Sequence, residues 1–390
     1  MRGSVGLVAT LALAMGAGPV LVHGLTAMSP LVVADLGLTR TQFGSLATLT
    51  FLVAGLSSGL AGALVDRISE RRTMVLLFVG SALTIWAAAA APGYLWLVLA
   101  VVLSGAVQAV SNPVTNRVVS WVDDPGRRGT VLGVKQAGVQ MAQASAGLVL
   151  PALALAVGWR WSLATAAAVS LAGLVLVVRH VRTPGRAAAE HATARRPRVR
   201  LPAAVWWLAA FAFLSGCALQ ATNVYLPLYG YQAVGLAGAA AGALTAVVGG
   251  VGLVARILWG RMVGRVPAPR APLLVLVAGS LLGLGLILLA ETAGAALLWV
   301  GTAVFAATGI AANVVLMVTV IRVVPPALVG RATGALATGL YLGFAVGPVT
   351  FGRVVDTTGD YRAGWLGAVA MFAVGGVLVL LRRDWTPRQR

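Results

Sequence analysis

Long apolar runs dominate the chain, and short polar or basic segments separate them. Twelve of these runs are long enough to cross a bilayer, because a spanning helix needs about 20 largely apolar residues. They lie at 5–27, 42–64, 73–91, 95–120, 129–156, 160–178, 203–228, 238–260, 271–290, 294–323, 330–352 and 364–381. The pattern predicts an all-α membrane protein with twelve transmembrane helices.

The composition supports this prediction and excludes several classes of function. Of the 390 residues, 59% are hydrophobic and 10% are charged, against roughly 25% charged in a soluble domain. The single cysteine, Cys217, excludes an intrachain disulfide framework, and no His/Cys cluster has the spacing of metal ligands. We therefore expect no metal and no cofactor. The sequence has no nucleotide-binding loop and no catalytic motif, so we do not expect an enzyme.

The two halves of the sequence resemble each other. When the first half is aligned with the second, Gly37 corresponds to Gly235 and Asn112 corresponds to Asn313. A duplicated scaffold of this kind is typical of transporters whose site lies between the halves. The first run could be a signal peptide because Arg2 precedes it, but its repeat counterpart lies in mid-chain and cannot be one.

The repeat and the basic segment between its copies predict the domain organisation. We expect an N-terminal six-helix bundle at 1–178, a basic cytoplasmic linker at 179–202 and a C-terminal six-helix bundle at 203–390.

The net charge of +19 is first a signal of topology. With the N-terminus inside, the outer loops hold only Arg40, Arg160, Arg353 and Arg362. The positive-inside rule thus predicts a multi-pass protein of the cytoplasmic (inner) membrane with both termini in the cytoplasm. The basic charge needs no nucleic-acid partner, and we expect a monomer in the lipid bilayer.

The loop after the second run carries a family signature. Gly62-Ala-Leu-Val-Asp66-Arg67-Ile-Ser-Glu70-Arg71-Arg72 resembles the cytoplasmic loop motif G-x-L-x-D-R-x-G-R-R of the major facilitator superfamily and departs from it at Glu70. The resemblance implies two bundles that rock about a midplane site. It also implies a cytoplasmic gate at Gly62, Asp66, Arg67, Arg71 and Arg72. The alternative is that these arginines only obey the positive-inside rule.

Charges inside the runs indicate the substrate. All ten acidic residues lie in loops or near helix ends, which disfavours an antiporter of cationic drugs. Lys135 and Arg256 lie inside runs of opposite halves, where a charge costs at least about 2.5–3.5 kcal/mol and usually faces a cavity. We predict that the two cations clamp one small anion. Arg256 resembles the substrate arginine of oxalate and other organic-anion members, and the segment around Lys135 resembles that of cyanate transporter relatives.

Polar side chains at helical spacing complete the predicted site. The predicted substrate-binding residues beside the two cations are Gln108, Asn112, Gln136, Gln140, Asn223, Asn313 and Tyr341. His23 is the candidate proton carrier, since an unperturbed histidine titrates near neutrality.

Each of these assignments has an alternative. Lys135 can extend to the membrane surface, and Arg256 can belong to the gate. The polar residues can hold helices together, and His23 can be structural.

The function predicted from the sequence is secondary active transport of a small anion, an organic carboxylate or a cyanate- or nitrate-like ion, by alternating access. Two alternatives remain. One is an exporter of neutral or amphipathic compounds, for which polar stripes suffice. The other is a membrane sensor that uses the same fold without transport.

Overall fold

The computed structural model describes residues 5–122, 124–181, 201–263, 265, 270–325 and 328–381. The elements that it assigns in this part of the chain are α-helices. They are α1 (Val5–Ala17), α2 (Pro19–Ala27), α3 (Ser29–Leu36), α4 (Arg40–Arg67), α5 (Glu70–Ala89), α6 (Tyr94–Gln108), α7 (Ser111–Val119), α8 (Pro125–Thr165), α9 (Ala167–His180), α10 (Ala203–Gln232), α11 (Gly238–Val263), α12 (Arg270–Ala293), α13 (Ala295–Thr308), α14 (Ala312–Val323), α15 (Val329–Thr358) and α16 (Tyr361–Leu381).

The helices account for the twelve predicted spans. Among the described residues, ten helical segments are long and apolar enough to cross a membrane, and the pair α1–α2, bent by 57°, forms an eleventh. One of the ten, Arg127–His180, contains a turn at Gly158, whose φ is 80°. The chain doubles back there, since the Ser162 hydroxyl donates to the Leu150 carbonyl. Two predicted spans are therefore joined in this segment.

Glycines at sharp turns repeat with the halves of the chain. Gly37 and Gly235 have φ of 60° and 78°, and Gly158 and Gly359 have φ of 80° and 72°. A residue with a Cβ rarely adopts this left-handed conformation, so these turns favour glycine. The two pairs follow the offsets of the sequence repeat.

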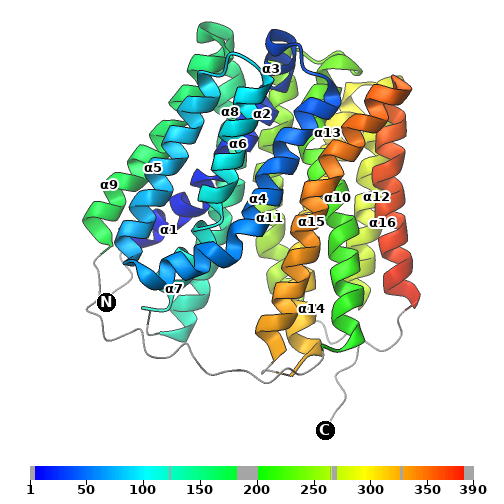
Figure 1. Cartoon of the computed structure of the whole chain (residues 1–390). Coiled ribbons are helices and arrows are strands. Elements are labelled where there is room, and N and C mark those ends of the chain that lie inside the picture. Colours follow the sequence, from blue (N-terminus) through cyan, green and yellow to red (C-terminus); the bar gives the residue numbers. More distant parts are fainter. Residues whose placement is uncertain are drawn as a thin grey trace.

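The helices form two bundles, α1–α9 and α10–α16, which stand side by side in Figure 1. "Upper" and "lower" below refer to the orientation of that figure, in which α3 lies at the upper end and α7 and α14 lie at the lower end. Of the predicted linker, 182–200 lies outside the described residues, so the prediction of a linker at 179–202 remains untested.

The hydrophobic core shows how the bundles meet. One buried cluster includes residues of both bundles, among them Phe43, Tyr225 and Leu244. Two further clusters belong to single bundles. The cluster around Val65 and Val118 lies in the first, and a cluster that runs from Val205 to Val379 lies in the second.

The two bundles are joined mainly in their upper half. α4 packs along α15, and α8 packs along α11. At the lower end, α7 packs on α1, α4, α5 and α8 of its own bundle, and α14 packs on α10, α11, α12 and α15 of the other. The lower ends diverge in Figure 1.

Candidate functional site

A hydrogen bond between two predicted site residues crosses the interface of the bundles. Arg256 of α11 donates from Nη1 to Oε1 of Gln140 in α8, at 2.7 Å. Gln140 is buried and Arg256 is half-buried. In the described part of the chain Arg256 forms no ion pair, so its nearest defined partner is a neutral amide.

Small residues bring α8 and α11 close enough for this bond. A Cβ added at Gly249 would lie 2.8 Å from the Gln140 carbonyl oxygen and 2.9 Å from Cα of Ala144. Gly147 of α8 makes an equally close approach to Thr245 of α11. Since Thr245, Gly249 and Arg256 follow helical spacing, the face of α11 that carries Arg256 is turned toward the first bundle.

Aromatic rings occupy the other long contact between the bundles, which α4 and α15 form. Phe51 lies with its ring centroid 5.1 Å from Phe344 and 6.4 Å from Tyr341, and the latter two rings are 5.9 Å apart. Phe51 and Phe344 were not predicted, although the spacing of Tyr341 and Phe344 places them on one helical face.

A second polar contact crosses the interface nearby. Nε2 of Gln143 in α8 lies 3.5 Å from Oδ1 of Asn223 in α10. Gln143 is buried and Asn223 is half-buried. Two glutamines one turn apart on α8, Gln140 and Gln143, thus face the other bundle.

Lys135 has different surroundings from Arg256. Its side chain is fully buried and donates from Nζ to Thr115 Oγ1 at 2.8 Å and to Asn116 Oδ1 at 2.5 Å. Both partners belong to α7 of the same bundle. The ammonium therefore does not reach solvent, and in this conformation Lys135 and Arg256 bind separate partners instead of one common group.

The remaining predicted residues have fewer defined contacts. Gln108, Asn112, Gln136 and Asn313 are half-buried, and Gln108 packs against Gly18, which lies between α1 and α2. His23 is buried in α2, and its Nε2 has no hydrogen-bond partner among the described residues. The structure does not place His23 in contact with Arg256.

The predicted gate lies at the lower end. Arg117 of α7 donates to the Val65 carbonyl at 2.7 Å, lies 3.4 Å from Asp66 and binds Glu70 Oε1 at 2.6 Å. Arg67, Arg71 and Arg72 are exposed. Around Gly62 a Cβ would meet no atom within 4 Å. The arginine that binds the acids of the loop is therefore Arg117, which lies outside the motif.

The second bundle repeats part of this arrangement. Arg322 of α14 donates to the Val263 carbonyl at 2.9 Å, as Arg117 does to Val65. Sequence reasoning missed both arginines because it treated them as positive-inside charges. Each lies in the last turn of its helix, and α7 and α14 take corresponding places in the two bundles; this shared position could have identified both arginines from the sequence.

A latch that the sequence did not predict closes the upper end. Asp356 of α15 accepts from the backbone N–H of Arg40 at 3.0 Å and from that of Thr41 at 2.7 Å. The Tyr225 hydroxyl of α10 donates to the Arg40 carbonyl at 2.5 Å. The first turn of α4 is thus held by two side chains of the other bundle.

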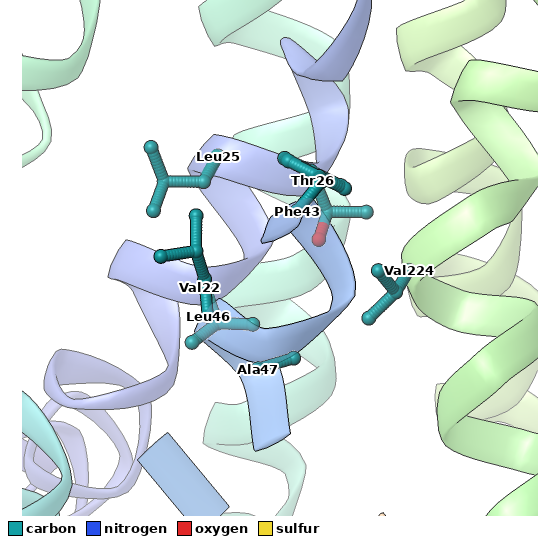
Figure 2. A pocket seen from close by; sticks show the side chains of 7 residues that line it. All are labelled: Val22, Leu25, Thr26, Phe43, Leu46, Ala47 and Val224. Atoms are coloured by element: carbon teal, nitrogen blue, oxygen red, sulfur yellow. The ribbon is translucent and has the colours of Figure 1, made fainter. Parts of the chain in front are cut away.

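A small apolar pocket lies between the bundles, shown in Figure 2. Val22, Leu25, Thr26, Phe43, Leu46 and Ala47 of α2 and α4 face Val224 of α10 across it. Thr26 supplies the one polar side chain of this lining, so the pocket has no group that would bind a charge. Within the described residues no three His, Cys, Asp or Glu side chains are grouped for a metal.

Sequence comparison identifies the family. The profile of the Major Facilitator Superfamily matches residues 6–348, and the chain belongs to that superfamily. Uncharacterized MFS-type transporters from two strains of Mycobacterium tuberculosis are 27% identical over 312 residues, which are 78% of this chain and 68% of theirs. The protein is a multi-pass membrane transporter of the secondary type.

Solved structures confirm the fold. A bacterial homolog of the human lysosomal transporter Spinster, in an inward-facing and occupied conformation, gives a TM-score of 0.77 at 15% identity, covering 97% of this chain and 96% of that one. The nucleoside transporter NupG gives 0.81 at 15% identity, covering 97% and 99%. A D-xylose-proton symporter gives 0.75 at 17% identity, covering 98% and 97%. At these identities the likeness supports the fold and not a substrate.

Proposed function

We propose that this transporter moves a small anion and that Arg256 binds it. The observation that carries the proposal is the half-buried guanidinium at the interface of the bundles, hydrogen-bonded to the neutral Gln140. A buried charge without an opposite charge is costly, and an anionic substrate would compensate it. A guanidinium can also bind a carboxylate through two parallel hydrogen bonds.

The polar residues around Arg256 fit a site that both bundles share. Gln140 and Gln143 face the second bundle, while Arg256, Asn223 and Tyr341 come from that bundle. A ligand held by both sides would change its contacts when the bundles rock. This is what alternating access about a midplane site requires.

We propose that Lys135, which belongs to the first bundle, is the second cation of the anion site. Its ammonium is held by Thr115 and Asn116, and we propose that it exchanges these neutral partners for the anion in another conformation. Gln108, Asn112, Gln136 and Asn313 stay predicted lining residues. His23 stays the predicted proton carrier.

We further propose that the lower end faces the cytoplasm and that the site opens there. The loop with Asp66 and Arg67 lies at that end, and the positive-inside rule assigns such a loop to the cytoplasm. The bundles meet in the upper half and separate below it. An inward-facing neighbour, the Spinster homolog, supports the same assignment.

Binding measured on the purified chain tests the proposed anion site. Isothermal titration calorimetry with acetate, benzoate, nitrate and cyanate is expected to give saturable binding of at least one anion. In the Arg256→Gln variant that affinity should fall at least about tenfold, as expected for loss of a charge-assisted contact. The matched control is Arg261→Gln, which removes an exposed cation of the same helix. Unchanged affinity in Arg256→Gln, or no anion bound by the native chain, contradicts the proposal.

A further inference from the structure

The contact between Arg256 and Gln140 fixes which way the buried amide faces. A guanidinium has N–H donors and no acceptor, so only the amide oxygen of Gln140 can meet it, as in the 2.7 Å bond from Nη1 to Oε1. The Nε2 group of the same amide is thereby turned away from the bonded nitrogen. Its two N–H donors have no hydrogen-bond partner among the described residues.

Packing between the bundles holds this amide in place. Gln140 is 6% exposed, and its backbone carbonyl lies against Gly249 of α11, where an added Cβ would be 2.8 Å from that oxygen. The next amide along α8, Gln143, contacts Asn223 of α10 instead. Gln140 is therefore the amide of α8 that accompanies the guanidinium.

The pair of side chains offers hydrogen-bond donors, and its one side-chain acceptor is already in use. One of the five guanidinium N–H groups is bonded to Gln140, and four remain. Backbone carbonyls in the middle of α8 and α11 accept bonds within their own helices. The acidic residues that the structure describes lie in the first or last turn of a helix or next to it, and none of them forms an ion pair with Arg256.

We infer that the substrate is an anion whose charged group carries acceptors and no hydrogen-bond donor, such as a carboxylate, a nitrate or a sulfonate. This inference rests on the proposed function. An O–H on the bound group would face N–H donors and lose the hydrogen bond that it makes to water, and burying an unpaired polar group is costly. The site should therefore reject hydrogencarbonate and a hydrogenphosphonate, although they carry the same charge as nitrate and a sulfonate.

Two sets of anions, matched in shape and charge, test the inference in the purified chain. Nitrate and acetate are compared with hydrogencarbonate at about pH 8, where all three carry one negative charge. Methanesulfonate is compared with hydrogen methylphosphonate at about pH 5.5, where both carry one negative charge. Isothermal titration calorimetry should show that the anion without an O–H binds at least about tenfold more tightly than its matched partner, because the O–H is left unpaired in the site.

One variant tests the role of the amide. Gln140→Leu keeps the approximate size of the side chain and removes its donors, so anions without an O–H should bind several-fold more weakly, and the difference from their matched partners should shrink. Met141→Leu is the control, since Met141 is exposed on the same helix, and it should change neither affinity. Melting temperatures check that both variants are folded. An unchanged ratio of affinities in folded Gln140→Leu would overturn the role of Gln140.

The possible results distinguish the two proposals. Equal affinities within a matched set, both lost in Arg256→Gln, would overturn the selection against donors and keep the anion site. Binding of benzoate or cyanate alone would overturn it as well, because the site would then select by shape. If no anion binds the native chain, or if Arg256→Gln binds anions normally, the proposed function itself fails.

Discussion

The carboxylate of Asp356 caps the first turn of α4 in the other bundle by accepting bonds from the backbone N–H and the hydroxyl of Thr41, at 2.7 and 2.6 Å. A helix N-terminus carries partial positive charge and unpaired N–H groups, so a carboxylate is stabilising there. The same carboxylate lies near the end of its own helix, α15, where negative charge is unfavourable. This bond can form only while the upper ends of the bundles are together.

Removal of this cap should shift the bundles toward opening at the upper end. A helix cap contributes about 1 kcal/mol, so we expect Asp356→Ala to change the ratio of closed to open molecules roughly fivefold. Spin labels at the exposed positions Ala34 of α3 and Thr357 of α15 would report the distance between the upper ends of the two bundles by double electron–electron resonance. The one native cysteine, Cys217, is buried and would not compete for label. Asp360→Ala is the control, and an equal shift in it would contradict the role of Asp356.

The gate acids should differ in their contribution to stability. Glu70 is 8% exposed and lies 2.6 Å from Arg117, whereas Asp66 is 75% exposed at 3.4 Å. Glu70→Ala leaves the half-buried Arg117 without its nearer partner and should cost about 2 kcal/mol, while Asp66→Ala should cost less than about 1 kcal/mol. Thermal unfolding in detergent measures both. A larger loss in Asp66→Ala would show that the motif acid carries the gate's stability.

Two adjacent glycines of α11 should respond differently to a methyl group. Gly249→Ala pushes against Gln140 and Ala144, and overpacking of this kind costs about 1–3 kcal/mol. Gly250→Ala meets no atom within 4 Å and should be neutral or slightly stabilising, since alanine favours the helix. Melting temperatures of the two variants check this. Similar values would mean that α8 and α11 do not approach as closely as described.

Lys135→Met tests whether the buried lysine serves function or packing. Its described partners, Thr115 and Asn116, are neutral, so an apolar side chain of similar length should leave the melting temperature unchanged or raise it. Anion uptake into proteoliposomes should be lost, because the variant removes the second proposed cation. A lower melting temperature with normal uptake would assign Lys135 to packing alone.

The ion pair of Asp35 with Arg160 at the upper end should make a pH-dependent contribution to the stability of the folded protein. The hydrogen bond from Arg160 lowers the pKa of Asp35 below its usual range. A depressed folded-state pKa stabilises the protein above the ordinary pKa near 4 and loses that effect as pH falls through the folded value. Since the pair is largely exposed, its contribution is less than about 1 kcal/mol.

The Asp35→Asn variant measures that contribution. Its melting temperature should lie slightly below that of the native chain at pH 7, and the difference should shrink as the pH falls below the ordinary pKa of about 4. In an Arg160→Gln background the substitution should have a smaller effect at pH 7. An unchanged difference from pH 7 to pH 3 would contradict the lowered pKa.

The sequence by itself determined the helices and the family. A spanning helix satisfies its backbone hydrogen bonds within one segment, so the apolar runs and the loop from Gly62 to Arg72 could be recognised without the tertiary structure. The repeat of Gly37 at Gly235 is likewise visible without a structure. The position of Arg256 inside an apolar run also shows, without a structure, that it places a positive charge within the membrane.

Only the tertiary structure decided which side chains meet. Lys135 and Arg256 both lie inside predicted spans, yet packing turns one to Thr115 and the other across to Gln140. Phe51 and Phe344 come together because α4 and α15 pack along each other. Asp356 finds Thr41 from 315 residues away for the same reason. Helical spacing fixes the face on which a residue lies, but the partner of that face depends on how the two bundles are joined.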